Sequence, residues 1–485
     1  MSFDSPFYLL FLAAIVLVHR LCPVKIRWAL LLAGSLFFYA CWSAPLTLVI
    51  VGVILLTWGC GLLIAGSKTR VRKRLWMAAA MAGCAGLLLW FKYFNFLADT
   101  FARIAGGAWE PLDILLPVGC SFYTFQAASY VLDVYRGRIA AERHPGHYAL
   151  YIAFFPQLVA GPIERAEALL PQLKAAKTAS REDARKGLAL VLSGLFRKLV
   201  IADMAAPAVD RVFAAVCPDG SAVFLALVLF AFQIYCDFAG YSEIAQGSAY
   251  LLGIRLRRNF DRPYLARTVR GFWRRWHMSL TAWFTDYVYI PLGGSRRGMG
   301  RQVFATMAVF FLSGLWHGAD WTFVLWGLWH GVLCVLEILL RRRERSGRGI
   351  LPLGQWALTA VLILPSWLLF RAANLGQVSM LFGRLFSAWD PLAGLSLLGL
   401  GGVRAACLAA ALLQLPLLDR LSRGRRVPDM VYFSWRHVSS WPGSSGPRGK
   451  ARTLSSIFSS DREVVRCGMA GACGGSQGCC WCCLS

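Results

Sequence analysis

Two histidines of this sequence lie among apolar and aromatic residues, where polar side chains are unexpected. His317 follows the apolar run of residues 303–315, and His277 follows a tryptophan in the sequence FWRRWHMSL. A neutral imidazole can take a proton from a hydroxyl group, and histidine is the most common general acid or base in enzymes. For His317 we favour catalysis over a packing role. For His277 the sequence fits a proton carrier and a loop anchor equally well.

The residues after His317 predict that the helix breaks there. Asp320 can cap the N-terminus of a helix that starts at Trp321. Non-helical backbone at membrane depth is tolerated only where it is buried in protein or lines a water-filled cavity. We therefore expect His317 to face an enclosed polar space between indole rings. Burial there disfavours the charged imidazolium, so the ring should be neutral at pH 7.

Another histidine, His330, lies 13 residues after His317. On one continuous helix this spacing corresponds to about 20 Å of rise and to a different helix face. We therefore expect His330 to have a packing role and not to share a substrate atom with His317.

Gln233, Asp237 and Glu243 are among the polar residues that interrupt the apolar run of residues 232–244, together with Tyr241 and Ser242. Polar groups inside a membrane are costly, so each is a candidate for function. The favoured interpretation is an interhelical hydrogen-bond network, with a functional role as the alternative.

The sequence lacks several common catalytic motifs, such as a GxxxxGKS-type phosphate loop and HExxH. Six of the fifteen cysteines lie in the last 19 residues, where two overlapping CxxC spacings make only a weak zinc pattern. We expect no metal site and no permanently bound cofactor. A buried base without an obvious protein nucleophile suits direct transfer between two bound substrates.

Composition indicates the elements that must position these residues. The 485 residues are 57% hydrophobic and 16% charged, with a formal net charge of +26. A helix of about 20 apolar residues spans a bilayer, and the sequence offers about ten or eleven such segments. The fold class is therefore an all-α polytopic membrane protein. Its basic residues are dispersed among the spans, as in cytoplasmic loops, which argues against a nucleic-acid partner and for the lipid bilayer.

Four stretches depart from simple spans. We expect residues 154–162 to be a re-entrant or interfacial piece, and residues 221–252 to form two segments broken around Gly240. The arginine-rich residues 255–275 should form an amphipathic helix in the membrane interface. Residues 1–427 form the transmembrane domain. Residues 428–485 are rich in serine, glycine and cysteine, and we interpret them as a separate tail that is disordered or the product of a reading-frame shift.

Five stretches of this sequence resemble the membrane-bound O-acyltransferase (MBOAT) superfamily, and within it the bacterial alginate O-acetylase branch. Their order along the chain also fits that superfamily. They are residues 116–133 (LPVGCSFYTFQAASYVLD), 154–165 (FFPQLVAGPIER), 232–245 (FQIYCDFAGYSEIA), 271–296 (GFWRRWHMSLTAWFTDYVYIPLGGSR) and 313–331 (SGLWHGADWTFVLWGLWHG).

The resemblance implies a fold and a function. The fold is a ring of tilted helices around a central tunnel. His317 matches the catalytic histidine of the superfamily, and His277 matches its second functional histidine. The protein would lie in the bacterial inner membrane and take acetyl groups from acetyl-CoA or another acetyl thioester in the cytoplasm. With periplasmic acetyltransferase partners, it would serve the O-acetylation of alginate or a similar exopolysaccharide.

Several alternatives remain open from the sequence. The acceptor polymer could be peptidoglycan, cellulose or teichoic acid, because a partner could hold it. A non-enzymatic transporter could use the same buried polar residues as a substrate path, but it should show an internal repeat of broken helices, and none is visible. A non-catalytic membrane scaffold is a third possibility.

Overall fold

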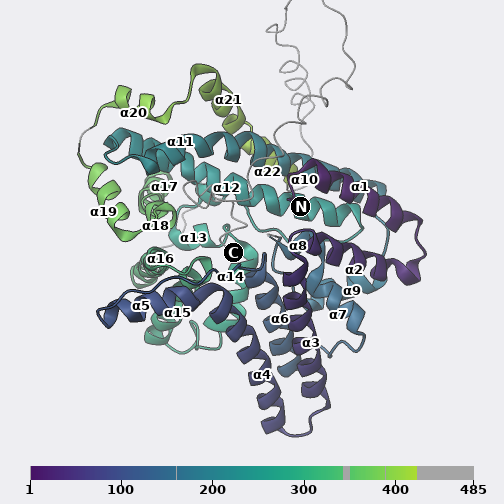
Figure 1. Cartoon of the computed structure of the whole chain (residues 1–485). Helices are drawn as coiled ribbons and strands as arrows, with labels where there is room; N and C mark the ends of the chain where they lie inside the picture. Colours follow the sequence, from purple (N-terminus) through teal and green to yellow (C-terminus); the bar gives the residue numbers. More distant parts are fainter. Residues whose placement is uncertain (1, 160, 342–349, 388, 423–485) are drawn as a thin grey trace, which may run out of the picture.

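The computed structural model describes residues 2–159, 161–341, 350–387 and 389–422. Throughout these ranges the regular secondary structure is helical, without strands, which confirms the all-α class (Figure 1). The proposed tail, residues 428–485, lies outside the described residues.

The N-terminal part contains these helices, of which η1 and η2 are π-helices: α1 (Pro6–Leu21), α2 (Val24–Ala40), α3 (Ala44–Gly66), α4 (Arg70–Leu88), η1 (Leu89–Tyr93), α5 (Phe94–Ile104), α6 (Cys120–Tyr135), α7 (Pro145–Ala153), α8 (Phe155–Leu158), α9 (Ala166–Ala175), α10 (Arg181–Leu195), η2 (Phe196–Ala202) and α11 (Asp203–Ala214).

The C-terminal part contains the following helices, of which η3 is a 3-10 helix and η4 a π-helix: α12 (Gly220–Leu251), η3 (Pro263–Leu265), α13 (Val269–Trp273), α14 (Met278–Phe284), η4 (Thr285–Tyr289), α15 (Met299–His317), α16 (Trp321–Leu339), α17 (Ile350–Ile363), α18 (Ser366–Arg371), α19 (Leu375–Arg384), α20 (Pro391–Leu398), α21 (Gly402–Leu413) and α22 (Leu415–Ser422).

Several helices are long and apolar enough to cross a membrane, as expected for a multi-pass protein. Five candidates meet both criteria among the described residues: Ala44–Gly66, Arg70–Ile104, Gly220–Leu251, Trp321–Leu339 and Ile350–Arg371. The sequence predicts about ten or eleven spans. Most of the other predicted spans form shorter helices, and residues 221–251 lie in one helix instead of two segments. Helices α1 and α6 have 16 residues each, or about 24 Å of rise, against a hydrocarbon core of about 30 Å.

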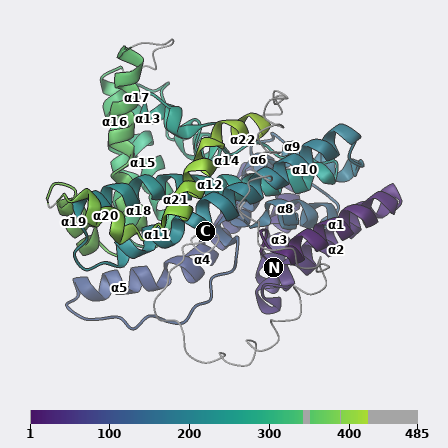
Figure 2. The same cartoon turned by 90° about the horizontal axis from the view of Figure 1, so that it is seen from above.

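Helix α12 is the central element of the fold and crosses the middle of the molecule in both views (Figures 1 and 2). It is one continuous helix of 32 residues, so the expected break around Gly240 is wrong. Gly240 instead permits close packing against α10, because a Cβ there would lie 2.8 Å from the carbonyl oxygen of Gly194. A second glycine contact follows seven residues on, between Gly247 and Gly187.

The arginine-rich residues 255–275 do not form the single amphipathic helix that the sequence suggested. The chain is irregular there, with several bends, and contains only η3 and the five-residue helix α13. Carboxylates of other elements replace the helical hydrogen bonds. Glu337 accepts the backbone N–H groups of Val269 and Arg270 at 2.8 and 3.0 Å, and Glu164 accepts that of Arg257 at 2.6 Å. The segment is therefore held by side chains of other elements as well as by its own backbone hydrogen bonds, such as Asp261 N–H to the carbonyl oxygen of Arg275 at 3.0 Å.

The stretch expected to be re-entrant is a short buried helix, α8. It packs against the start of α6 at Gly119, which has a left-handed φ of 70°. Only glycine fits there, because a Cβ at this position would lie 2.3 Å from the carbonyl oxygen of Leu158. Helices α3, α4 and α6 run side by side as a group (Figure 1). Helices α15 and α16 also pack on each other. His317 is the last residue of α15, immediately before the turn that joins the two helices.

Candidate functional site

His317 is the last residue of α15, and its side chain is enclosed by aromatic rings. Only 3% of the residue is exposed. Its ring centroid lies 4.9 Å from those of Trp316 and Trp326 and 5.5 Å from that of Phe370. Each of the helices α15, α16 and α18 thus contributes one aromatic ring around the imidazole. The structure confirms the expected indole surroundings of this imidazole.

The last carbonyl groups of α15 bind side chains of another helix. In η1, Lys92 donates from Nζ to the carbonyl oxygen of Trp316, and the Tyr93 hydroxyl donates to that of Leu315 at 2.8 Å. A cation is favourable at a helix C-terminus, where carbonyl groups lack intrahelical partners. Lys92 was missed by our sequence interpretation, although a charge inside the apolar residues 87–97 is a usable signal.

The predicted break after His317 is confirmed. Asp320 caps α16 by accepting the backbone N–H of Thr322 at 2.8 Å, and the chain is non-helical from Gly318 to Asp320. His317 is therefore held at a turn between two packed helices, with α15 before it and α16 after it.

The expected separation of His330 from His317 is wrong, because it assumed one continuous helix. The turn folds α16 back on α15, and both imidazoles contact Trp326, with centroids at 4.9 Å for His317 and 5.1 Å for His330. Nε2 of His330 lies 3.0 Å from the Ser366 hydroxyl, which itself donates to the carbonyl oxygen of Ile363. His330 thus ties α16 to α18.

His277 precedes α14 and is almost completely buried, with 1% exposed. Its backbone has a left-handed φ of 43°, a conformation that is uncommon for residues other than glycine. The Nδ1 atom lies 3.4 Å from Oδ1 of Asn259. The Nε2 atom is buried and has no hydrogen-bond partner among the residues that the structure describes. Because buried polar atoms normally have a hydrogen-bond partner, we expect a substrate or a water molecule to bind this nitrogen.

The structure brings His277 and His317 to the same indole ring. The Trp316 centroid lies 5.8 Å from that of His277 and 4.9 Å from that of His317. Phe122 and Phe238 complete the surroundings of His277 with centroid distances of 6.1 and 4.7 Å. Residues 40 positions apart in the sequence therefore form one aromatic-lined cluster, which we call the histidine cluster: His277, Trp316 and His317.

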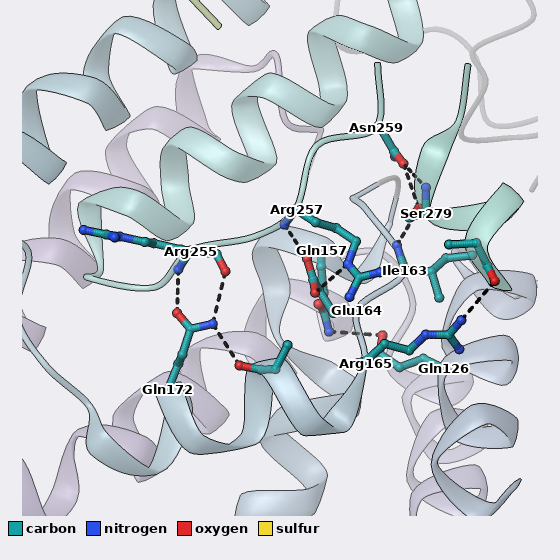
Figure 3. A network of polar contacts seen from close by, with 12 residues as sticks. Gln126, Gln157, Ile163, Glu164, Arg165, Gln172, Arg255, Arg257, Asn259 and Ser279 are labelled. Carbon is teal, nitrogen blue, oxygen red and sulfur yellow. Dashed lines mark hydrogen bonds and ion pairs between the residues drawn. The ribbon is translucent and has the colours of Figure 1, made fainter. Parts of the chain in front are cut away.

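Figure 3 shows a polar network that includes Asn259 and Ser279. Asn259 also contacts Nδ1 of His277, so the network holds the backbone next to this histidine. The Ser279 hydroxyl donates to Oδ1 of Asn259 at 2.7 Å and accepts the backbone N–H of Ile163 at 3.0 Å. The next residue after Ile163 is Glu164, whose carboxylate accepts hydrogen bonds from the backbone N–H and from the guanidinium of Arg257 at 2.6 and 3.3 Å. Hydrogen bonds with the residues before α9 thus fix the position of the arginine-rich segment. Asn259 is a site residue that the sequence did not reveal.

The acidic residues of α12 form ion pairs with basic residues of η2 and do not contact the histidine cluster through these pairs. Glu243 accepts from Nε of Arg197 at 3.1 Å, and Nη2 of Arg197 donates to Asp419 at 2.7 Å. Asp237 pairs with Lys198 at 2.7 Å. These pairs join α12 to η2 and α22, as the interhelical interpretation of Asp237 and Glu243 predicted.

A cavity of about 410 Å³ adjoins α15 one turn before the histidine cluster. Ser313, four residues before His317, lies in its wall, together with apolar side chains such as Phe310. Arg270 and Arg274 also line it. We call this space the arginine-lined cavity. Among the described residues, no group of three or more His, Cys, Asp or Glu side chains is placed to hold a metal ion.

The fold and the histidine cluster define a multi-pass membrane protein with buried imidazoles, and comparison with known proteins gives its family. The model of the membrane-bound O-acyltransferase family, MBOAT, matches residues 144–346. A Pseudomonas putida protein named "Probable alginate O-acetylase AlgI" is 36% identical over 426 residues, which cover 86% of each chain. The chain belongs to the membrane-bound O-acyltransferase family and is an acyltransferase.

Relatives that modify other polymers are also similar. The peptidoglycan O-acetyltransferase of Helicobacter pylori is 34% identical over 373 residues, or 71% of each chain. The teichoic acid D-alanyltransferase of Bacillus subtilis is 26% identical over 269 residues, which cover 52% of this chain and 67% of that protein.

Proposed function

We propose that this acyltransferase moves acetyl groups from a cytoplasmic donor across the inner membrane for the O-acetylation of alginate or a similar exopolysaccharide. The observation that carries the proposal is the histidine cluster, in which His277 and His317 are both buried against Trp316. The names of the relatives at 36% identity support the acetyl group and alginate.

In the proposed reaction, His317 acts as the general base. Its neutral imidazole accepts the proton of an acceptor hydroxyl while the hydroxyl oxygen attacks the carbonyl carbon of the thioester. A C–O bond forms, the C–S bond breaks, and the proton passes to the leaving thiolate. His277, with its buried Nε2, orients a substrate or moves a proton. Holding both substrates in an enclosed site would supply much of the rate acceleration.

The arginine-lined cavity is a suitable approach for the donor. Arg270 and Arg274 match the phosphates of acetyl-CoA, because guanidinium groups bind phosphate with paired hydrogen bonds. Apolar side chains such as Val309 and Phe310 line the rest of the wall, and Ser313 is the lining residue nearest to His317 along α15. We propose acetyl-CoA, or another acetyl thioester, as a substrate that binds there and leaves. Periplasmic acetyltransferase partners would complete the transfer to the polymer.

The decisive experiment uses purified protein in proteoliposomes with radiolabelled acetyl-CoA and an oligosaccharide acceptor. We expect ester-linked label on the acceptor or on an added periplasmic partner. Proteoliposomes that carry His317→Ala should release free CoA no faster than empty vesicles. If wild-type protein transfers no label from any acetyl thioester, the donor proposal is wrong.

A second candidate is the acetylation of peptidoglycan, which the Helicobacter pylori relative favours. Cellulose and teichoic acid are further acceptors of the same kind. Ester acetate measured on each polymer, in strains with and without the gene, separates these substrates. Unchanged acetate on all of them would reject the acetyl-transfer function.

A further inference from the structure

A second cavity of about 410 Å³ lies between α12 and α17, and its lining is almost entirely apolar. Phe224 and Ala231 contribute from α12, and Trp356 and Ala360 contribute from α17. Known small-molecule sites have volumes of about 300–1,000 Å³, so this space is large enough for a ligand. We call it the α12–α17 cavity.

The α12–α17 cavity is built into the fold. Helix α17 is attached at its rim through Trp356, whose indole N–H donates to the carbonyl oxygen of Tyr264 at 2.8 Å. The Tyr264 hydroxyl in turn donates to the carbonyl oxygen of Ala231 on α12 at 2.8 Å. These two hydrogen bonds bridge α17, the arginine-rich segment and α12 at one edge, and the space behind them remains open.

The surroundings of the cavity select an apolar chain as its occupant. Both α12 and the segment Ile350–Arg371, which contains α17, are long and apolar enough to cross a membrane. A bilayer around these helices would place hydrocarbon at the opening between them. Water is disfavoured in a space lined by apolar groups, because it would lack hydrogen-bond partners. An acyl chain of a membrane lipid fits both the lining and the location.

Arginines next to the lining residues favour a lipid with an anionic headgroup. Pro263, Tyr264 and Ala266 line the cavity and belong to the arginine-rich segment. Arg262 and Arg267 flank them, and Arg262 is exposed. The acid nearest in sequence, Asp261, lies 3.9 Å from the Arg262 guanidinium. Arginines beside a membrane attract anionic headgroups.

We propose that the α12–α17 cavity binds an acyl chain of an anionic phospholipid whose phosphate lies against Arg262. This site is separate from the histidine cluster, and the proposal does not depend on the acetyl-transfer function.

The inner wall of the cavity connects the lipid to the histidine cluster. Phe272 and Trp367 line the cavity, and both rings lie 5.3 Å from that of Trp276, the residue before His277. Trp367 also lies 5.8 Å from Phe370, which contacts the His317 ring. A bound chain therefore supports the aromatic packing behind both histidines.

Native mass spectrometry of the full chain, purified in a mild detergent, tests the proposal directly. We expect wild-type protein to retain phosphatidylglycerol in preference to phosphatidylethanolamine. Ala360→Phe fills the cavity and should reduce the retained lipid several-fold. Leu358→Phe is the matched control, because Leu358 lies on the same helix, is 48% exposed and does not line the cavity. Equal retention by the two variants would show surface lipid only and overturn the proposal.

A melting experiment covers the case in which Ala360→Phe fails to fold. Phosphatidylglycerol added to delipidated protein should raise the melting temperature, because a ligand that binds only the folded state stabilises it. Arg262→Gln should weaken this response, whereas Arg296→Gln, at an exposed arginine outside the cavity, should leave it unchanged. An equal response to phosphatidylglycerol in both variants, or no response in wild type, would contradict the headgroup assignment.

Discussion

The side-chain oxygen of Asn259 lies 3.4 Å from Nδ1 of His277 and also accepts the Ser279 backbone N–H and hydroxyl, at 3.2 and 2.7 Å. A carbonyl oxygen only accepts hydrogen bonds, so this contact favours the tautomer in which Nδ1 of His277 carries the proton. The buried Nε2 is then an acceptor, which is the form that can receive a proton. Asn259 thus favours this tautomer of His277.

Asn259→Ala should impair turnover more than substrate binding. The change leaves the buried donors of His277 and Ser279 without their acceptor, at a cost of about 1–3 kcal/mol for each. We expect kcat for acetyl transfer to fall about tenfold to a hundredfold with a smaller change in KM. Asn259→Asp restores an acceptor and favours the protonated ring, so its pH profile should move to higher pH. An Asn259→Ala enzyme with wild-type kcat would remove this positioning role.

His317→Ala should abolish most acetylation, and His277→Ala should impair it less severely. Loss of a general base typically costs about 10²–10⁴-fold in rate. His330→Gln is the control, because His330 is equally buried and contacts the same indole, Trp326. It should lower stability and retain activity per folded molecule. Wild-type acetylation by His317→Ala would exclude this residue as the base.

Gly194→Val should destabilise the contact between α10 and α12. Even a Cβ at Gly194 would lie 2.5 Å from the carbonyl oxygen of Gly240, so the two helices must separate. Overpacking of this kind costs about 1–3 kcal/mol. Thermal melting in detergent measures the loss. Gly59→Ala on α3 is the control, since a Cβ there meets nothing within 4 Å, and it should leave the melting temperature unchanged or raise it.

Arg197→Met should destabilise the fold strongly. The Arg197 side chain is completely buried and faces Glu243 and Asp419, so its removal leaves two acidic groups without this cation. Breaking a buried ion pair typically costs about 3–5 kcal/mol. Adding Glu243→Gln to Arg197→Met should recover part of the loss. The surface pair of Arg103 and Asp99 provides the comparison, because Arg103→Ala should change the melting temperature little.

Lys174→Met should weaken the protein at neutral pH more than at acidic pH. Burial raises the pKa of Glu142, but hydrogen bonds from Lys174 and from the His144 backbone lower it overall. Because the folded pKa is lowered, the stabilisation is present above the unfolded value of about 4.3 and is lost as the pH falls through the folded value.

Melting temperatures measured from neutral to acidic pH check this sign. The difference between wild type and Lys174→Met should be largest near neutral pH and should shrink once Glu142 is protonated in both proteins. Lys177→Met removes an exposed lysine nearby and serves as the control. A constant difference across the pH range would show that Lys174 acts without the Glu142 charge.

Local sequence determined the helical class and the position of the break beside His317. Long uncharged runs require helices in a bilayer, because every backbone group must be paired within the segment. Asp320 marked the start of α16, since an N-cap depends only on residues close by in the chain. The acyltransferase family was also visible in the motifs that contain His277 and His317.

Only the tertiary structure decided which distant residues meet. Gly240 signals a break by local propensity, but close packing against Gly194 keeps α12 continuous. Carboxylates from other elements hold residues 255–275 out of a helix, and no local pattern contains those partners. The turn after His317 likewise brought His330 to the same indole. Contacts across folded helices depend on packing, which sequence spacing along one helix does not describe.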